Sequence, residues 1–249
     1  MLHFTERGAG PPLLLVHGVM ITGDMFEPVL DRFAARHRVI VPDLRGHGRS
    51  RTLPPPYTVE QLARDLSRLL DHLDVRSADV LGYSQGGAVV QQLALDDPAR
   101  CRRLVLACTY AFNTATLREK LEGHAAPLLI AALGMKRFAE LVIALGLKRV
   151  ESRRAEWVVG LIADQDPHLM TAAWKAAMAF DSRPRLGDIT CPTLVVAGRR
   201  DNAVPFHHAT MLHEGIRGST LAVIDDADHA LVWTHPDALV RIVEEFLDG

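Results

Sequence analysis

The chain has 249 residues, with 28 Lys and Arg against 30 Asp and Glu, and 48% of its residues are hydrophobic. This length allows one large domain, or one domain with an insertion, that needs no disulfide or metal to hold its core. A net charge of −2 excludes the basic surface of a nucleic-acid-binding or anionic-membrane-binding protein. The composition also excludes disordered, collagen-like and coiled-coil chains.

The cysteines and the N-terminus indicate the compartment. Cys101, Cys108 and Cys191 are odd in number and lack Cys-x-x-Cys spacing, which predicts buried free thiols in a reducing compartment. The first residues lack a basic segment followed by an apolar one, so no signal peptide is predicted. The apolar runs are shorter than the roughly 20 residues that span a bilayer. We therefore expect a soluble cytoplasmic protein with no membrane span, in an oligomeric state that the sequence leaves open.

Short apolar runs alternate with amphipathic stretches along most of the chain. The runs predict strands at residues 12–17, 38–42, 78–83, 103–107, 193–197 and 220–224. The amphipathic stretches predict helices at residues 26–36, 59–73, 85–95, 206–214 and 236–247. The runs are rich in Val and Leu without polar alternation, which is typical of parallel strands buried on both faces. The alternation therefore predicts an α/β fold with a parallel sheet between two layers of helices.

One segment departs from this alternation. Residues 111–182 predict helices only, at residues 115–122, 125–133, 136–147, 152–162 and 167–180. We expect a helical cap over residues 111–182, inserted in a core formed by residues 1–110 and 183–249. Trp157, Trp174, Met135, Met170 and Met178 lie in this segment, and they could line a substrate pocket or form the cap's own core.

A serine stands at a turn between a predicted strand and a predicted helix. Ser84 lies in Gly-Tyr-Ser-Gln-Gly, a G-x-S-x-G motif in the strand–turn–helix context of a nucleophile elbow. The glycines allow the backbone to pass close to the sharp turn, and the helix N-terminus directs free N–H groups at a developing oxyanion. Ser84 is thus a candidate nucleophile, with the N–H groups of Gln85 and of Val19 after the first predicted core strand as oxyanion donors.

A serine nucleophile needs a base and a carboxylate that orients it. His229 and Asp201 each follow a predicted strand, so they share the carboxyl edge of the sheet with Ser84. An acid after the strand that ends near residue 107 is the alternative, but residues 100–118 contain no Asp or Glu. The chain order Ser, Asp, His is that of α/β-hydrolases.

These motifs together resemble the α/β-hydrolase superfamily. The matching pieces are His17-Gly18, residues 43–50, the elbow at Ser84, residues 198–205 and Asp228-His229, and the resemblance covers about residues 1–110 and 185–249. The groups most similar are small bacterial esterases, enol-lactone hydrolases, carbon–carbon bond hydrolases and cofactor-free haloperoxidases. The resemblance implies an α/β-hydrolase fold, Ser84 as nucleophile, His229 as base, Asp201 as acid, Val19 and Gln85 at the oxyanion hole, and no cofactor. The short N-terminus departs from the family, because the first strand is missing or is a vestige at residues 2–6.

Twelve histidines raise the question of a metal site. His207 and His208 are adjacent and so are not expected to share one helix face, and no His-Glu-x-x-His helix is present. We therefore expect no metal. His17 is expected to hold the loop that carries Val19 rather than to move protons.

The expected function is a cofactor-independent serine hydrolase that cleaves a small, largely apolar carboxylic ester or lactone through an acyl-enzyme. The same triad could instead cleave a carbon–carbon bond or use peroxide in place of water. A ligand-binding sensor on a hydrolase scaffold is the alternative outside enzymes, because a fold does not fix a function.

Overall fold

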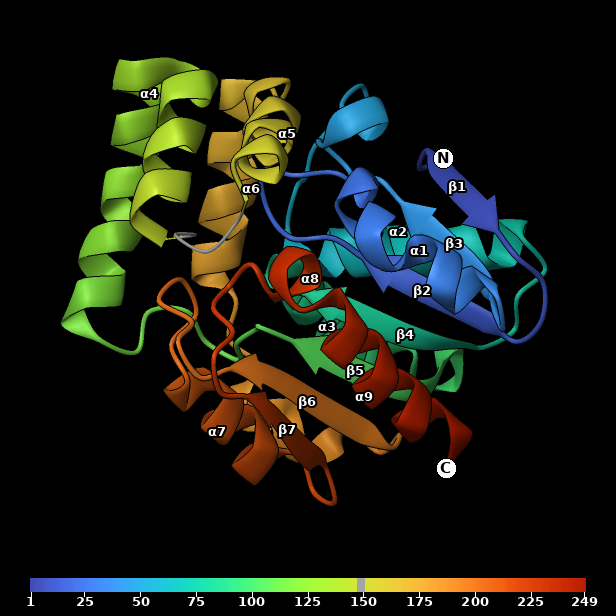
Figure 1. Ribbon diagram of the computed structural model, residues 1–249. Coiled ribbons are helices and arrows are strands. Elements are labelled where there is room, and N and C mark those ends of the chain that lie inside the picture. The colour runs from blue at the N-terminus through green and yellow to red at the C-terminus, as the bar shows by residue number, and fades with distance from the viewer. Residues whose placement is uncertain (147–150) are drawn as a thin grey trace.

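The computed structural model describes residues 1–146 and 151–249, which form a seven-stranded sheet covered by helices (Figure 1). The strands are β1 (Phe4–Arg7), β2 (Pro12–Val16), β3 (Arg38–Pro42), β4 (Ala78–Tyr83), β5 (Cys101–Ala107), β6 (Thr193–Gly198) and β7 (Thr220–Ile224). They lie in the order β1-β3-β2-β4-β5-β6-β7, and every neighbouring pair is parallel except β1 with β3. The predicted mostly parallel α/β sheet is confirmed.

The sequence left open whether the first strand is missing or is a vestige near residues 2–6. The structure has a short strand there. β1 pairs antiparallel with β3 at the edge of the sheet, in a register that sets Phe4 opposite Pro42. Its other three residues, Thr5, Glu6 and Arg7, are exposed. Charged residues are common on edge strands, because they discourage further pairing with other chains.

Two layers of helices bury the two faces of the sheet. On one face lie α1 (Glu27–Ala34) and α9 (Pro236–Asp248), and on the other α2 (Val59–His72), α3 (Gln85–Asp96) and α7 (His207–Gly215). Successive side chains of a strand point to opposite faces, so Leu13 and Leu15 of β2 pack toward α1 and α9, whereas Leu14 and Val16 pack toward α2 and α3. A short helix that was not predicted, α8 (Leu231–Thr234), leads into α9.

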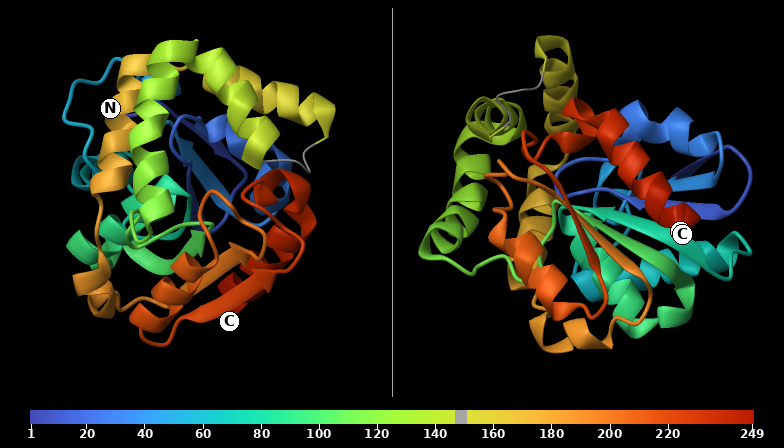
Figure 2. Two further views of the ribbon diagram at one scale, coloured as in Figure 1. Left: turned by 90° about the vertical axis from the view of Figure 1, so that its left-hand side faces the viewer. Right: turned by 60° about the horizontal axis from the view of Figure 1, so that its bottom comes forward.

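Between β5 and β6 the chain forms α4 (Leu117–Gly146), α5 (Ser152–Ala163) and α6 (Pro167–Ala179), here called the helical insertion. The three helices stand together beyond the edge at which the parallel strands end (Figures 1 and 2). An isolated bridge between Phe112 and Asp181 joins the two ends of the segment.

The expected helix break after residue 122 is wrong. α4 continues through Gly123, whereas the break expected between residues 133 and 136 is confirmed at Gly134, whose φ of 71° and ψ of 166° are not helical. Gly123 lies against α6, because an added Cβ there would be 2.6 Å from the Met178 sulfur and the Trp174 indole N–H donates to its carbonyl. Packing between α4 and α6 thus outweighs the helix-breaking preference of glycine. The predicted helix at 136–147 ends at Gly146, and residue 147 lies outside the described residues.

Two further observations concern the compartment. All three cysteines are free thiols, with Cys101 and Cys108 buried and Cys191 partly buried. Within residues 1–146 and 151–249, no helix combines the length and apolar character needed to cross a bilayer.

Candidate active site

The three candidate catalytic residues follow strands that end at one edge of the sheet. Ser84 follows β4, Asp201 lies three residues after β6, and His229 lies five residues after β7. The chain reverses its direction of progress across the sheet between β2 and β4, which lie side by side. Open α/β sheets bind ligands in the crevice beyond such a reversal.

Ser84 occupies a strained turn. Its φ of 53° and ψ of −123° are rarely adopted by a residue with a side chain, and such conformations cost about 1–3 kcal/mol. The Ser84 N–H donates to Ala107 O at 3.0 Å and the Thr109 hydroxyl donates to Ser84 O at 2.6 Å. These bonds to β5 and the segment after it hold the serine at the first turn of α3.

The two glycines of the motif make this turn possible. An added Cβ on Gly82 would lie 2.5 Å from Gly86 O, and one on Gly86 would lie 2.2 Å from Val16 O. Both positions therefore require the absence of a side chain, because strand β4, helix α3 and strand β2 approach one another at backbone distance.

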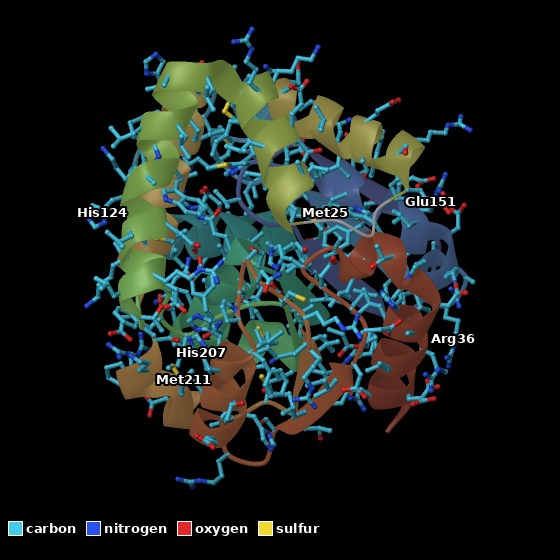
Figure 3. The ribbon with its side chains drawn as sticks, turned by 60° about the vertical axis from the view of Figure 1, so that its left-hand side comes forward. Met25, Arg36, His124, Glu151, His207 and Met211 are labelled. Carbon is cyan, nitrogen blue, oxygen red and sulfur yellow. The ribbon has the colours of Figure 1, made fainter. Side chains whose placement is uncertain are left out.

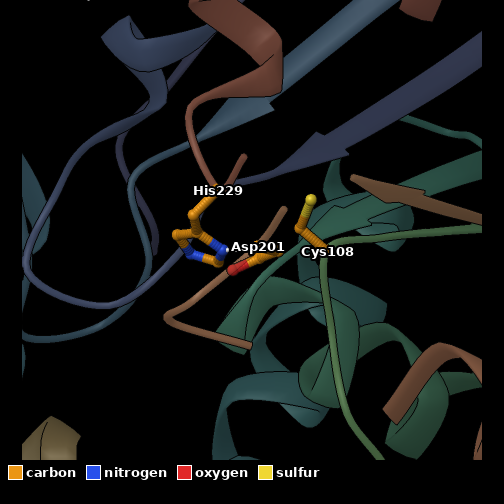
Figure 4. Close-up of side chains that lie close together, drawn as sticks. All are labelled: Cys108, Asp201 and His229. Atoms are coloured by element: carbon orange, nitrogen blue, oxygen red, sulfur yellow. Dashed lines mark hydrogen bonds and ion pairs between the residues drawn. The ribbon is translucent and has the colours of Figure 1, made fainter. Parts of the chain in front are cut away.

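His229 and Asp201 form a hydrogen-bonded pair (Figure 4). The Nδ1 atom of His229 lies 2.8 Å from Oδ2 of Asp201, and Oδ1 of Asp201 accepts the N–H groups of Ala203 and Val204 at 2.9 and 2.8 Å. The carboxylate is nearly buried, whereas the imidazole keeps 16% of its surface exposed. Because Nδ1–H donates to the carboxylate, Nε2 of His229 is the nitrogen with the free lone pair.

The acidic residues near His229 in sequence lie in other contacts. Asp225 pairs with Arg199 and Asp226 with His235. Asp228 accepts the Ala230 N–H at 2.8 Å, which closes the turn after the histidine. Asp201 is thus the carboxylate that the structure brings to Nδ1 of His229.

His17 positions the loop of the proposed oxyanion donor Val19. Its Nδ1–H donates to Gly18 O at 2.7 Å, and its Nε2 accepts the Leu44 N–H at 2.8 Å. Burial lowers the pKa of His17, which keeps the ring neutral. The expected structural role of His17 is confirmed. Gly18 lies against the elbow, since an added Cβ there would be 3.1 Å from the Ser84 Cβ.

A cavity of about 200 Å³ joins Ser84 and His229. The sheet side contributes Val19, Tyr83 and Tyr110, and the helical insertion contributes Phe138, Val158, Ile162 and Trp174 among others. In the described part of the chain, no Asp, Glu, Lys or Arg lines this cavity. Asn113 contributes its one side-chain amide.

The sequence left open whether five large residues of the insertion line the pocket or form the insertion's own core, and the structure places them differently. Trp174 lines the cavity. Met135 and Met170 are buried in an apolar cluster that the insertion shares with Met20 of the core, and Met178 and Trp157 pack against the two clusters on the faces of the sheet.

Two residues beside the triad candidates were not singled out from the sequence. The Tyr83 hydroxyl donates to the His229 carbonyl, and the two rings lie 5.1 Å apart. Cys108 lies close to Asp201 and His229 (Figure 4). Burial raises the pKa of the Cys108 thiol well above its ordinary value, so the thiol stays protonated beside the carboxylate. The positions of Tyr83 and Cys108 beside the triad candidates depend on how separate segments pack together, which the sequence does not show.

His207 and His208, which were not expected to share one helix face, both turn toward Glu119. Both residues begin α7, and both Nε2 atoms lie within 3.2 Å of one carboxylate oxygen of Glu119. At the first residues of a helix, side chains one position apart can both turn toward a neighbouring element.

Comparison with known proteins is consistent with this geometry. The family model described as alpha/beta hydrolase fold matches residues 11–132, and one described as TAP-like protein matches residues 165–249. RutD of Azorhizobium caulinodans, whose name assigns it a proposed carbamate hydrolase activity, is 33% identical over 98% of this chain and 94% of its own. A pimeloyl acyl-carrier-protein methyl ester esterase of Neisseria meningitidis is 31% identical over 94% of this chain and 93% of its own. The enol-lactonase structure from Burkholderia xenovorans aligns with a TM-score of 0.90 and 25% identity, covering 100% of this chain and 96% of that one. The chain belongs to the α/β-hydrolase family and is a hydrolase of that family.

Proposed function

We propose that the protein is a serine hydrolase that cleaves small, uncharged carboxylic esters or lactones through an acyl-enzyme. The observation that carries the proposal is the convergence of a strained Ser84 and an Asp201-paired His229 on one apolar cavity. No metal or organic cofactor is needed for this chemistry.

The geometry supports a conventional sequence of steps. His229 Nε2 takes the proton of Ser84 Oγ as that oxygen attacks the carbonyl carbon, and the N–H groups of Val19 and Gln85 stabilise the oxyanion. The leaving alcohol receives the proton from His229, and the acyl group stays on Ser84. Water then attacks the acyl-enzyme with the same histidine as base. Asp201 stays ionised and holds the imidazole in the tautomer that the first step requires.

The lining of the cavity supports an uncharged substrate. A carboxylate or ammonium in an apolar cavity loses its hydration and needs a partner of opposite charge. The described lining offers Ser84, His229, Asn113 and two tyrosine side chains, with no Lys, Arg, Asp or Glu. Substrates that carry a carbamate ion or a free carboxylate are anionic and are therefore poorer in this proposal than short esters and lactones.

A matched panel tests this proposal. We expect kcat/KM for p-nitrophenyl butyrate to exceed that for a p-nitrophenyl ester of similar length ending in a carboxylate by at least ~100-fold, in line with the cost of an unpaired buried charge. A neutral γ-lactone of similar size should also be hydrolysed. Equal rates on the charged and neutral esters would contradict the assignment of substrate class.

The other chemistries are separated by the same assay. Acyl transfer to added hydrogen peroxide in preference to water would assign a perhydrolase, and cleavage of a vinylogous diketone in place of esters would assign a carbon–carbon hydrolase. A single stoichiometric burst with no further turnover would assign a sensor on a hydrolase scaffold.

A further inference from the structure

A second cluster of chemically active side chains lies outside the proposed active site. Glu119, in the first turn of α4, meets His207 and His208 at the start of α7. Oε1 of Glu119 lies 3.0 Å from Nε2 of His207 and 3.2 Å from Nε2 of His208, and the two imidazole rings lie 4.1 Å apart. Figure 3 shows His207 beside the lower end of α4, whereas His124 lies on the outer side of that helix.

We propose that Glu119, His207 and His208 form a binding site for a divalent transition-metal ion, with zinc as the best fit. The bound ion would link the helical insertion to the core.

The donor set and its spacing fit zinc. Two imidazole nitrogens and one carboxylate oxygen are a set of three ligands that leaves the fourth tetrahedral position to water. Zinc holds such atoms at about 2.0–2.2 Å, which places two ligand atoms roughly 3.3–3.6 Å apart at a tetrahedral angle. The two distances from the Glu119 oxygen are close to that range, and all three ligand atoms lie within 4.8 Å of one another. Small rotations of the side chains therefore complete the geometry.

The carboxylate is already oriented by its own helix. Oε2 of Glu119 accepts the Thr116 N–H at 2.9 Å, while the Thr116 hydroxyl accepts the Glu119 N–H at 3.2 Å. This reciprocal pair is a capping box. It occupies one carboxylate oxygen and leaves the other facing the two histidines, with only 7% of the Glu119 side chain exposed.

The two histidines differ in ways that suit a metal site. His208 is fully buried and packs edge-on against the Tyr110 ring at 6.2 Å. His207 is 42% exposed, so an ion and its water ligand can reach the site from solvent.

The position of the cluster indicates how a bound ion would affect the stability of the protein. Glu119 belongs to the insertion, which supplies one wall of the cavity, and His207 lies six residues after Asp201, at the end of the loop that carries it. A bound ion links these two segments, which are otherwise far apart in sequence. It therefore stabilises the native arrangement of insertion and core by binding the folded chain alone.

The test measures zinc binding and its effect on thermal unfolding of the full chain after treatment with a chelator. Isothermal titration calorimetry with zinc chloride should give one ion per chain. Scanning calorimetry with free zinc at 100 times the dissociation constant should raise Tm by about 5–10 °C, from the linkage relation and the stability change per degree typical of this size.

Glu119→Gln and His207→Ala should abolish the zinc-dependent rise in Tm. Glutamine keeps the capping box with Thr116, so Glu119→Gln folds and changes the ligand alone. His124→Ala removes an exposed histidine from the same helix and should leave the rise unchanged.

A second variant separates this cluster from the triad candidates. Cys108, Asp201 and His229 also lie within 4.8 Å of one another at their ligand atoms, so the titration is repeated with His229→Ala, which should keep the rise. Loss of the rise in His229→Ala, or its persistence in Glu119→Gln, would overturn the proposal. No rise in the unaltered protein would also overturn it and would leave a carboxylate that accepts two imidazole N–H groups.

Discussion

His229 Nδ1 lies 2.8 Å from Asp201 Oδ2, and the other oxygen of that carboxylate accepts the N–H groups of Ala203 and Val204. Both oxygens of Asp201 are therefore occupied, one by the imidazole and one by its own loop. The loop fixes the carboxylate, and the carboxylate fixes the tautomer and the plane of the ring.

Asp201→Asn tests the role of this charge. An amide in this place keeps an oxygen for Ala203 and Val204 but presents an NH₂ group to His229, which favours the wrong tautomer. We expect kcat to fall by about 10⁴-fold while the fold is retained, as for the equivalent change in a serine protease triad. Steady-state kinetics with p-nitrophenyl butyrate and a circular dichroism melt measure the two effects.

Asp228→Asn is the matched control, because it alters the charge next to His229 in sequence without altering its partner. Asp228 accepts the Ala230 N–H, which an asparagine oxygen also does. A loss in Asp228→Asn as large as in Asp201→Asn would contradict the assignment of the acid.

Gly86→Ala tests the close approach at the elbow. The new Cβ would lie 2.2 Å from Val16 O and 2.5 Å from His17 O, both backbone atoms, so strand β2 or helix α3 must move. We expect a lower Tm and a fall of at least ~100-fold in kcat/KM, because displacements near 1 Å at a reacting group have that effect. An active variant with an unchanged Tm would show that the elbow tolerates the shift.

Gly160→Ala is the opposite case in the helical insertion. Gly160 lies inside α5, and nothing lies within 4 Å of the added Cβ. Alanine should stabilise the protein by about 0.5–1 kcal/mol through its higher helix propensity. Urea unfolding measures the difference, and a destabilised variant would contradict the exposure of this face of α5.

Because His47 is buried, we expect the protein to lose stability in mild acid. Burial lowers its pKa from 6.5 to about 3, so between these values the unfolded chain binds a proton that the native chain does not. Stability therefore falls as pH falls through this window, by up to about 1.4 kcal/mol per pH unit. Urea unfolding from pH 7 to pH 4.5 should give a steeper decline for the unaltered protein than for His47→Asn. Parallel curves would show that His47 titrates normally.

Most of the core could be predicted from the sequence, because its strands are apolar runs buried on both faces. β3, β4 and β7 were predicted to the residue, β2 and β6 to within one residue, and β5 starts two residues before its predicted start. β1 was left open, because its Thr-Glu-Arg sequence is exposed and gains order from pairing with β3. The course of α4 through Gly123 depends on Met178 and Trp174 of α6, which are more than fifty residues away.

The site divides in the same way. Ser84, Asp201 and His229 could be proposed as a triad from the sequence, because a motif and a position at a strand end are local signals. The apolar wall of the cavity, and the meeting of Glu119 with His207 and His208, depend on how the helical insertion packs on the core. The division of the chain into core and cap at residues 110 and 183 remains a prediction.

The measurement that tests the central claim most directly is intact-mass analysis after treatment with a fluorophosphonate, which reacts with activated serines without requiring a known substrate. The proposal predicts one adduct per chain, mapped to Ser84 by peptide sequencing and absent from Ser84→Ala, whose turnover of p-nitrophenyl butyrate should fall by several orders of magnitude. No adduct on the folded protein, or an adduct that persists in Ser84→Ala, would contradict the assignment of Ser84 as the nucleophile.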